Sequence, residues 1–420
     1  MDTVNPKTTH FEFFGPVGAA AVTIGTPLLT YWLFLACTPT HCATASLPIL
    51  PPLQDFLTLQ ACGLYAAWFL LLMALYYLLP GEQVQGQPLV TGTKLSYKIN
   101  GFSSLRLILA VVVAGLFMNP KFLEPLWEQT LPLLTASLLA SIGLALWSYT
   151  TSYTQDKALL AHGGNSGIFI YDFFIGRHLN PRLFNGSFDV KYFCELRPGL
   201  FLWVLLNLAN LMHQYNTTGT VGLGMLLVCA FQIWYATDSV INEEKVLSTM
   251  DITTDGFGFM LAFGDLCWVP FVYSQQSRYL ALHPVTLSWP ILAAVVASQA
   301  IGFYLFRSAN SQKDRFRNDP THASVKDLRF IQTQRGTKLL CDGWWGKARH
   351  INYLGDWIMA WSYCLPTGFG MPLTYFYVVY FAVLLIHRER RDEDKCSRKY
   401  GKDWLAYKAK VPWRIIPYVY

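Results

Sequence analysis

The chain has 420 residues, a formal net charge of +6 at pH 7, and a composition of 53% hydrophobic and 14% charged residues. Its mean hydropathy is +0.29. Soluble domains carry about 25% charged residues, so this composition excludes an ordinary soluble domain and predicts an integral membrane protein. We expect membrane lipid among its partners and no nucleic acid.

The chain opens with a polar segment, Met1 to His10, which lacks the basic start of a cleavable signal peptide. The first apolar run follows directly, so we interpret it as a retained span. A membrane-spanning helix needs about 20 apolar residues, or fewer where protein encloses it. Ten stretches are predicted spans: Gly15 to Cys37, Leu59 to Leu79, Phe102 to Met118, Leu131 to Tyr149, Gly199 to Met212, Val221 to Thr237, Phe257 to Tyr273, Val285 to Phe306, Tyr353 to Leu365 and Met371 to Ile386.

The distribution of basic residues orients these spans, because Lys and Arg collect in cytoplasmic loops. With both termini in the cytoplasm, all of the 32 basic residues except Lys121 and Arg278 lie on the cytoplasmic side. We therefore predict about ten transmembrane helices with both termini cytoplasmic. The charge is densest between Arg307 and Arg349 and between Arg388 and Arg414, so any function that uses anions is expected at the cytoplasmic end of the C-terminal part.

The predicted fold class is an all-α integral membrane protein with one domain over residues 1–420. Residues 1–306 would supply eight spans that form a wall, and residues 307–420, with two spans, would supply most of the polar groups. The segment Thr150 to Pro198 is too aromatic for a linker and is expected to fold against the membrane surface.

The cysteines and glycines exclude several kinds of site. The 9 cysteines are scattered and form no Cys-x-x-Cys pair, so neither a disulfide framework nor a zinc site is indicated. The histidines lack the spacing of metal ligands, and no metal or haem site is expected. No Gly-x-Gly-x-x-Gly motif follows a strand pattern, so a dinucleotide would have to be held without a Rossmann module.

The densest group of chemical side chains lies between Leu339 and Asp356. Here a Gly-Trp-Trp-Gly quartet at 343–346 precedes Arg349, His350 and Asn352. Tryptophan offers a flat surface for a ring, arginine a fork for phosphate, and asparagine an amide. Tryptophans at a membrane interface are the alternative explanation for the pair. We interpret His350 as an orienting hydrogen-bond group rather than a metal ligand.

Two basic clusters flank this stretch in sequence. Lys313 and Arg317 lie four residues apart after the eighth span, hence on one helical face that could grip a phosphate. Contact with anionic lipid is the alternative. The run from His387 to Tyr400 interleaves acids with bases, which suits a ligand that carries phosphates and hydroxyls, such as a dinucleotide. A solvated helix with internal ion pairs is the alternative there.

Acidic side chains gather from the end of the sixth span into the seventh: Asp238, Glu243, Glu244, Asp251, Asp255 and Asp265. Carboxyl groups in or near a membrane are costly and indicate function by default. Burial raises the pKa of a carboxyl group, which could then donate a proton. A helix cap or a structural ion pair is the alternative for any single one.

Three motifs resemble the sterol reductase family, which includes delta-14 sterol reductase, 7-dehydrocholesterol reductase, the yeast-type C-24(28) reductase and the membrane domain of the lamin B receptor. They are Gly167-x-x-Ile-Tyr-Asp-x-Phe-x-Gly-x-x-Leu-Asn-Pro-Arg182, Leu339-Leu-x-x-Gly-Trp-Trp-Gly-x-x-Arg-His-x-Asn-Tyr353, and a third motif from His387 to Tyr407. The Gly-Trp-Trp-Gly quartet and the closing Pro-Tyr-Val-Tyr are most similar to the delta-14 branch. Asp342 departs from the family, where Ser is usual.

The resemblance implies NADPH-dependent reduction of a sterol carbon–carbon double bond, most closely the C14–C15 bond of a delta-8,14 sterol that enters from the bilayer. Proton donation to C15 would accompany hydride transfer to C14. The candidate proton donors are Tyr235, Asp238, Glu243, Asp255 and Tyr407. The family's cofactor positions, in the C-terminal half, fall on Lys313, Arg317, Leu340, Trp345, Asn352, Tyr353, Asp392, Cys396, Ser397, Arg398, Lys399, Tyr400 and Tyr407. Lys313 and Arg317 would read the 2′-phosphate.

Three other functions stay open: a 7-dehydrosterol reductase, an isoprenylcysteine-type membrane methyltransferase and a non-enzymatic sterol-binding protein. The methyltransferases have a similar Arg-His-x-x-Tyr-x-Gly pattern, but the ten spans and the Asn180-Pro181-Arg182 sequence disfavour them. We expect a multi-pass protein of a bacterial inner membrane or the endoplasmic reticulum, with the cofactor site facing the cytoplasm.

Overall fold

The computed structural model describes residues 4–40, 42, 48–155 and 158–420. The chain separates into two compact units, Met1–Pro284 and Val285–Tyr420. The boundary precedes helix α15 (Trp289–Asn318), so the eighth expected span belongs to the C-terminal unit rather than with the seven spans before it. The interpretation as a single domain stays a prediction.

The N-terminal unit is built mainly of helices. They are α1 (Gly15–Leu35), α2 (Leu53–Phe56), α3 (Leu59–Leu78), α4 (Gly101–Met118), α5 (Glu124–Glu128), α6 (Thr130–Thr154), α7 (Phe169–Ile175), α8 (Val190–Leu196), α9 (Pro198–Thr218), α10 (Leu223–Ile241), η1 (Glu243–Ser248), α11 (Met250–Thr253), α12 (Phe259–Phe263), η2 (Gly264–Trp268), α13 (Val269–Tyr273) and α14 (Gln275–Leu282). Two antiparallel hairpins interrupt them: β1 (Glu82–Gln85) with β2 (Ser96–Ile99), and β3 (Arg182–Leu183) with β4 (Phe188–Asp189).

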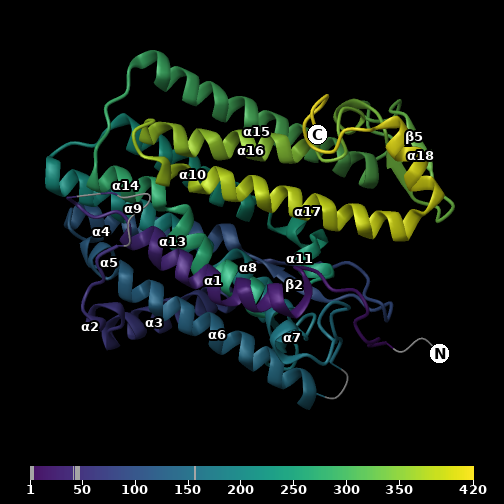
Figure 1. Ribbon diagram of the computed structural model, residues 1–420, viewed down its shortest axis with the longest axis horizontal. Helices are drawn as coiled ribbons and strands as arrows, with labels where there is room; N and C mark the ends of the chain where they lie inside the picture. The colour runs from purple at the N-terminus through teal and green to yellow at the C-terminus, as the bar shows by residue number, and fades with distance from the viewer. Residues whose placement is uncertain (1–3, 41, 43–47, 156–157) are drawn as a thin grey trace. The chain divides into compact units, whose positions relative to one another are not determined.

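In the C-terminal unit, α15, α16 (Ile351–Cys364) and α17 (Phe376–Tyr400) run side by side (Figure 1). Gly302 and Gly355 let α15 and α16 approach closely, since a Cβ on Gly355 would lie 2.6 Å from the Phe306 nitrogen. The shorter elements of this unit are β5 (Phe330–Gln332), β6 (Lys338–Leu340), η3 (Gly343–Gly346), η4 (Leu365–Thr367), η5 (Pro372–Tyr375) and α18 (Lys402–Lys410).

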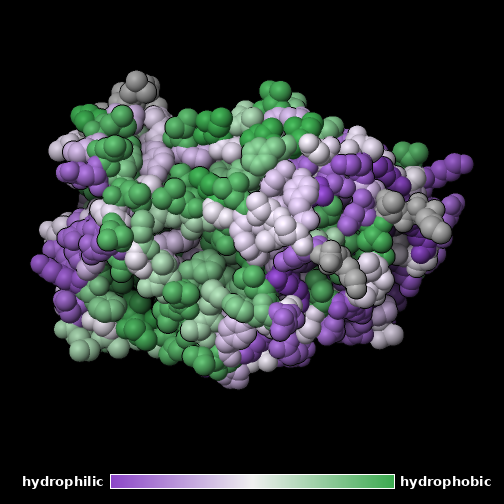
Figure 2. All heavy atoms as spheres, turned by 90° about the horizontal axis from the view of Figure 1, so that it is seen from below, coloured by the Kyte–Doolittle hydropathy of each residue, from purple (hydrophilic) through white to green (hydrophobic). Residues whose placement is uncertain are grey.

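Six helices in the described part of the chain are long and apolar enough to cross a membrane: Gly15–Leu35, Leu53–Leu78, Gly101–Met118, Thr130–Thr154, Leu223–Ile241 and Trp289–Asn318. They coincide with the first, second, third, fourth, sixth and eighth expected spans. Apolar side chains such as Leu28, Leu70 and Leu139 are exposed on them, and Figure 2 shows apolar residues gathered between hydrophilic ends on one face. The protein is therefore a mostly helical multi-pass membrane protein.

The other four expected spans fall on shorter, interrupted or more polar helices. The fifth lies in α9, the seventh is divided among α12, η2 and α13, and the tenth covers η5 and the first part of α17. The ninth is α16, whose 14 residues extend only about 21 Å at 1.5 Å per residue. That these four also cross the membrane stays a prediction.

Buried amide side chains explain the polarity of α9. Trp203 and Asn207 donate to the Gln232 side-chain oxygen at 3.1 and 2.9 Å, and Gln232 donates to Gln276 at 3.1 Å. Ser277 donates to the Asn207 side-chain oxygen at 2.6 Å. All five side chains are at most 1% exposed. Such bonds between helices satisfy polar groups away from water, so α9 can be both polar and central.

The seventh expected span is interrupted at Asp265 by the π-helical turn η2. The main-chain oxygen of Asp265 lies against Gly199, where an added Cβ would come within 1.6 Å of it. One carboxylate oxygen of Asp265 is buried and has no hydrogen-bond partner in the described part of the structure. The interruption thus turns a carboxyl group into the interior of the N-terminal unit.

The first motif, at 167–182, forms a close crossing of backbone segments. Gly176 has a φ of 94°, and an added Cβ would lie 2.3 Å from the carbonyl carbon of Gly256. Asp172, which is fully buried, accepts hydrogen bonds from the main-chain amides of Ser166 and Gly167, both at 2.8 Å. The motif therefore determines how the segment before α8 packs onto its unit.

Cys37 and Cys42, which follow α1, form a disulfide that the scattered cysteine pattern did not predict. The remaining seven cysteines are free. Both sulfur atoms and a ring nitrogen of His283 lie within 4.8 Å of one another, the only cluster of potential metal ligands found among the described residues. A disulfide offers no thiolate to a metal ion, so this cluster does not contradict the expectation that the protein has no metal site.

Replacing Gly176 with alanine should destabilise the protein far more than replacing Gly186. Both glycines have positive φ, 94° and 85°, which costs other residues about 1–3 kcal/mol. A Cβ at Gly176 would also overlap neighbouring backbone, whereas nothing lies within 4 Å of one at Gly186. Thermal unfolding of the two purified variants in detergent measures the difference, and equal melting temperatures would refute the close crossing.

Candidate cofactor-binding site

A cavity of about 120 Å³ in the C-terminal unit is bounded by the end of α15, strand β6, α18 and the acidic part of α17. This is close to the volume of about 150 Å³ that holds a benzene molecule, so it accommodates one ring or phosphate of a larger ligand. The expected cofactor residues that line it are Lys313, Arg317, Leu340, Trp345, Asp392, Cys396, Tyr400 and Tyr407. The expected residues outside its described lining are Asn352, Tyr353, Ser397, Arg398 and Lys399.

The Gly-Trp-Trp-Gly quartet forms the short helix η3, which packs Trp345 against α15. The Asp342 carboxylate accepts a hydrogen bond from the Gly343 amide at 2.8 Å and so caps this turn. The Trp345 indole N–H donates to the Ala309 main-chain oxygen at 2.8 Å. The Lys313 ammonium lies 3.8 Å from the Trp345 ring centroid. Trp345 thus holds a cation at the cavity through its ring face.

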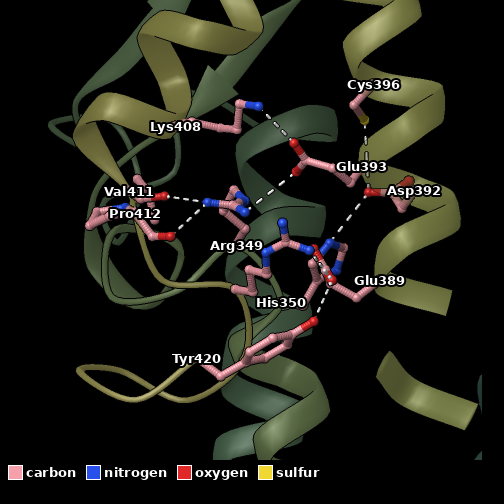
Figure 3. Close-up of polar contacts among 11 residues, drawn as sticks. Arg349, His350, Glu389, Asp392, Glu393, Cys396, Lys408, Val411, Pro412 and Tyr420 are labelled. Atoms are coloured by element: carbon pink, nitrogen blue, oxygen red, sulfur yellow. Dashed lines mark hydrogen bonds and ion pairs between the residues drawn. The ribbon is translucent and has the colours of Figure 1, made fainter. Parts of the chain in front are cut away.

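Arg349, which the sequence suggested as a phosphate ligand, lines the cavity and is also engaged within the protein (Figure 3). Its guanidinium donates to the main-chain oxygens of Val411 and Pro412, both at 2.9 Å. It also lies 3.4 Å from the Glu393 carboxylate, which pairs with Lys408 at 2.9 Å. The side chain of Arg349 is only 4% exposed, so it joins the cavity wall to the segment after α18.

Asp392 faces His350 and Cys396 at the cavity (Figure 3). One Asp392 oxygen lies 3.5 Å from His350 Nε2 and accepts a hydrogen bond from the Cys396 thiol at 3.7 Å. The His350 ring stacks on Tyr353 with centroids 4.9 Å apart. Burial lowers the pKa of His350 from 6.5 to about 4, although the Asp392 charge opposes this shift. His350 is therefore neutral at pH 7, as a hydrogen-bonding group should be.

Asn352 offers an unused acceptor in α16. Its side-chain nitrogen donates to the Asn310 side-chain oxygen at 3.2 Å. Its own side-chain oxygen is buried, and no described group donates to it. A buried amide oxygen without a donor is unfavourable, so this atom fits a hydrogen-bond donor brought by a ligand.

Among the five candidate proton donors, Tyr407 lies in the same unit as the cavity and lines it. It is 5% exposed, and its ring contacts that of Trp404 with centroids 5.0 Å apart. Burial raises the pKa of Tyr407 well above its ordinary value. The phenol therefore keeps its proton at neutral pH.

The other four candidates lie in the N-terminal unit. The Tyr235 ring packs edge-on against Trp203 with centroids 6.1 Å apart. Asp238 accepts from the Asn242 side chain at its main-chain oxygen, at 2.9 Å, and the main-chain oxygen of Asp255 accepts from the buried Lys191 ammonium at 2.8 Å.

Glu243, the remaining candidate, is held in a buried ion pair. Its carboxylate accepts from the Arg197 guanidinium at 2.6 Å, the Tyr192 hydroxyl at 2.5 Å and the Gly101 amide at 2.6 Å. The side chains of Arg197 and Glu243 are 0% exposed. Three donors already occupy the carboxylate, which suits a structural partner of Arg197 better than a proton donor.

The cavity also contains residues that the sequence interpretation left out, including Phe316, Lys338, Leu339 and Trp404. Phe316 lies between the two predicted phosphate ligands on α15. Lys338 immediately precedes the second motif and Leu339 begins it, and both enter the wall because β6 pairs with β5 there. A hairpin pattern before Leu340 was the available signal, but three-residue strands leave little periodicity to read.

The fold and the cavity together define a multi-pass helical membrane protein with a cation- and aromatic-lined ligand site. The model of the ergosterol biosynthesis ERG4/ERG24 family matches residues 7–420. The chain is 50% identical over 425 residues to Delta(14)-sterol reductase erg24 of Schizosaccharomyces pombe, covering 99% of both chains. It is 45% identical over 443 residues to ERG24 of Saccharomyces cerevisiae and 48% identical over 423 residues to TM7SF2 of Mus musculus, also named Delta(14)-sterol reductases, with 100% of each chain covered. The chain therefore belongs to the ERG4/ERG24 family, as its three motifs predicted.

Replacing His350 with glutamine should make the protein less sensitive to acid. The folded-state pKa of His350 is lowered from 6.5 to about 4, so the unfolded chain binds more protons between these values and the free energy of unfolding falls as the pH decreases. The loss amounts to about 3 kcal/mol at the lower end. Melting temperatures measured across this pH range should fall less steeply for His350→Gln than for the unmodified protein. The exposed His322 provides the control variant His322→Gln, which should keep the original slope.

Proposed function

We propose that this protein reduces the C14–C15 double bond of a delta-8,14 sterol with NADPH as the reductant. The observation that carries this proposal is the family match over residues 7–420, together with whole-length relatives that are named Delta(14)-sterol reductases. The structure supports it with a polar ligand cavity next to helices that carry exposed apolar side chains in their own unit, such as Ile301 and Tyr304 on α15.

The cavity residues fit a dinucleotide phosphate in their chemistry. Lys313 and Arg317 would hold the 2′-phosphate. Outside the described lining of the cavity, the unsatisfied oxygen of Asn352 would accept a hydrogen bond from the carboxamide or a hydroxyl group. Trp345 keeps the Lys313 ammonium at the cavity. Bound NADPH would supply the hydride that the double bond receives.

The protein itself must supply the proton, because no electron-withdrawing group activates the sterol diene, which accepts a hydride only when a carbon of the bond gains cationic character. We assign this role to Tyr407, whose protonated hydroxyl belongs to a side chain that lines the cavity. Proton donation to C15 leaves C14 as the carbon that receives the hydride. A positioned acid of this kind contributes about 10²–10⁴-fold to a rate.

We further propose that the cavity faces the cytoplasm and that the sterol enters from the bilayer of the endoplasmic reticulum. The loop after the first span carries the Cys37–Cys42 disulfide, and disulfides persist in oxidising compartments. In the ten-span topology, an odd number of crossings separates this loop from the segment between the eighth and ninth spans. Residues 307–349, which carry Lys313 and Arg317, then lie on the opposite, cytoplasmic side.

Purified protein should convert a delta-8,14 sterol to a product that has gained two hydrogen atoms, when NADPH is supplied. Mass spectrometry of the sterol measures this directly, and absence of turnover with NADPH would refute the proposed function. Tyr407→Phe should lower turnover about 100-fold while NADPH binding persists. Normal turnover by Tyr407→Phe would show that another residue donates the proton.

Replacing both Lys313 and Arg317 with alanine should raise the KM for NADPH more than the KM for NADH. The two cofactors differ only in the 2′-phosphate, and each lost charge contact to a phosphate is worth about 1.5–3 kcal/mol. Steady-state kinetics with both cofactors test the effect. Arg315→Ala is the control, because Arg315 is exposed on the same turn of α15 and is absent from the described cavity lining. Equal changes for NADPH and NADH would contradict the assigned role.

A further inference from the structure

Glu389 on α17 is a buried carboxylate outside the cavity. It is 0% exposed, and it does not belong to the described lining of the cavity. The Arg414 guanidinium donates to both of its oxygens, at 3.0 and 3.3 Å, and the Tyr420 hydroxyl donates to one of them at 3.3 Å (Figure 3). These three residues form what we call the Glu389 clamp.

The clamp lies one helical turn from two acids that do contact the cavity wall. Glu389 precedes Asp392 by three residues and Glu393 by four, so the three carboxylates share one face of α17. Asp392 contacts His350, and Glu393 contacts Arg349. A shift or rotation of α17 at Glu389 would therefore move both wall contacts together.

The segment that carries Arg414 also holds the backbone of the cavity wall. The Arg349 amide donates to the main-chain oxygen of Trp413 at 3.0 Å, and the His350 amide donates to that of Arg414 at 2.7 Å. Both amides lie outside the hydrogen-bond ladder of α16, which begins at Ile351. The position of the two wall residues consequently depends on the position of Arg414.

Arg414 is fixed in turn by Tyr420. The main-chain oxygen of Tyr420 accepts hydrogen bonds from the amides of Arg414, Ile415 and Ile416, at 2.8, 3.0 and 3.2 Å. The Arg414 guanidinium also lies 5.6 Å from the centroid of the Tyr420 ring. Tyr420 thus contacts Arg414 through both its main-chain oxygen and its ring. Through these two kinds of contact the clamp connects α17 to the cavity wall.

We propose that Glu389, Arg414 and Tyr420 are positioning residues for the cofactor: they set where Arg349 and His350 lie at the cavity without contacting the ligand themselves. That the ligand is NADPH rests on the proposed function, whereas the contacts of the clamp do not depend on it. Loss of the Glu389 charge leaves the Arg414 guanidinium without its buried partner, which loosens Arg414 from α17, while Val411 and Pro412 stay connected to Glu393 through Arg349.

Two measurements on the full-length protein test this proposal. In Glu389→Gln, the amides of Arg349 and His350 should exchange hydrogen at least about tenfold faster without any ligand, because their acceptors become mobile. The KM for NADPH should rise about tenfold, while the KM for the sterol and kcat at saturating NADPH stay within about threefold, because only cofactor placement changes. Tyr420→Phe removes one contact of the clamp and should give smaller changes in the same direction.

The matched control is Asp394→Asn, which removes a negative charge from an exposed position on the same helix and should leave both measurements unchanged. Unchanged hydrogen exchange at Arg349 and His350 in Glu389→Gln would overturn the clamp, whether or not NADPH is the cofactor. Faster exchange with an unchanged NADPH KM would overturn its positioning role. If Glu389→Gln does not fold, Tyr420→Phe decides by the same two readouts, and the exchange data retain their meaning even if the unmodified protein fails to turn over NADPH.

Discussion

A buried carboxylate is stable only when charged or polar partners replace the water that it has lost, and this constraint organises the C-terminal unit. Glu389, Asp392 and Glu393 lie along one face of α17. Glu389 is matched to Arg414 after α18, whereas Asp392 and Glu393 are matched to the adjacent residues His350 and Arg349 before α16. Because the spacing of the three acids is fixed by the helix, their partners are fixed relative to one another as well. The part of the cavity wall formed by Arg349 and His350, which precede α16, therefore takes its position from a rigid helix.

The same constraint operates in the N-terminal unit with different chemistry. Glu243 is matched to Arg197, and Asn207 is matched to Gln232 and Ser277. In a lipid environment these pairs hold helices together where apolar contact alone gives little preference over lipid. A polar residue within an apolar run is therefore better explained by a partner on another helix than by a catalytic role. Asp265 differs, since one of its oxygens has no partner among the described residues.

Sequence reasoning was reliable where one local property decides the structure. Continuous apolarity located the six long helices, and the spacing of Lys313 and Arg317 placed both at one cavity. It did not reveal contacts that are distant in sequence. The fifth expected span coincides with α9, but its polar partners on α10 and α14 were not predicted. The acceptors of the Arg349 guanidinium, which lie about sixty residues further on, were not predicted either. The Cys37–Cys42 disulfide left no recognisable spacing.

The motif that is densest in chemical groups is, in the structure, largely a support. Its Arg349 binds the segment after α18, and the Trp345 indole N–H binds α15. Two of the cations at the cavity, Lys313 and Arg317, and the acid Asp392 come from α15 and α17, which this support contacts. Dense aromatic and basic sequence therefore both lines the cavity, as Leu340 and Trp345 do, and holds in place the helices that supply other ligand groups. Differences in specificity within the family should accordingly arise in the helices that the motif joins, even where the motif itself is unchanged.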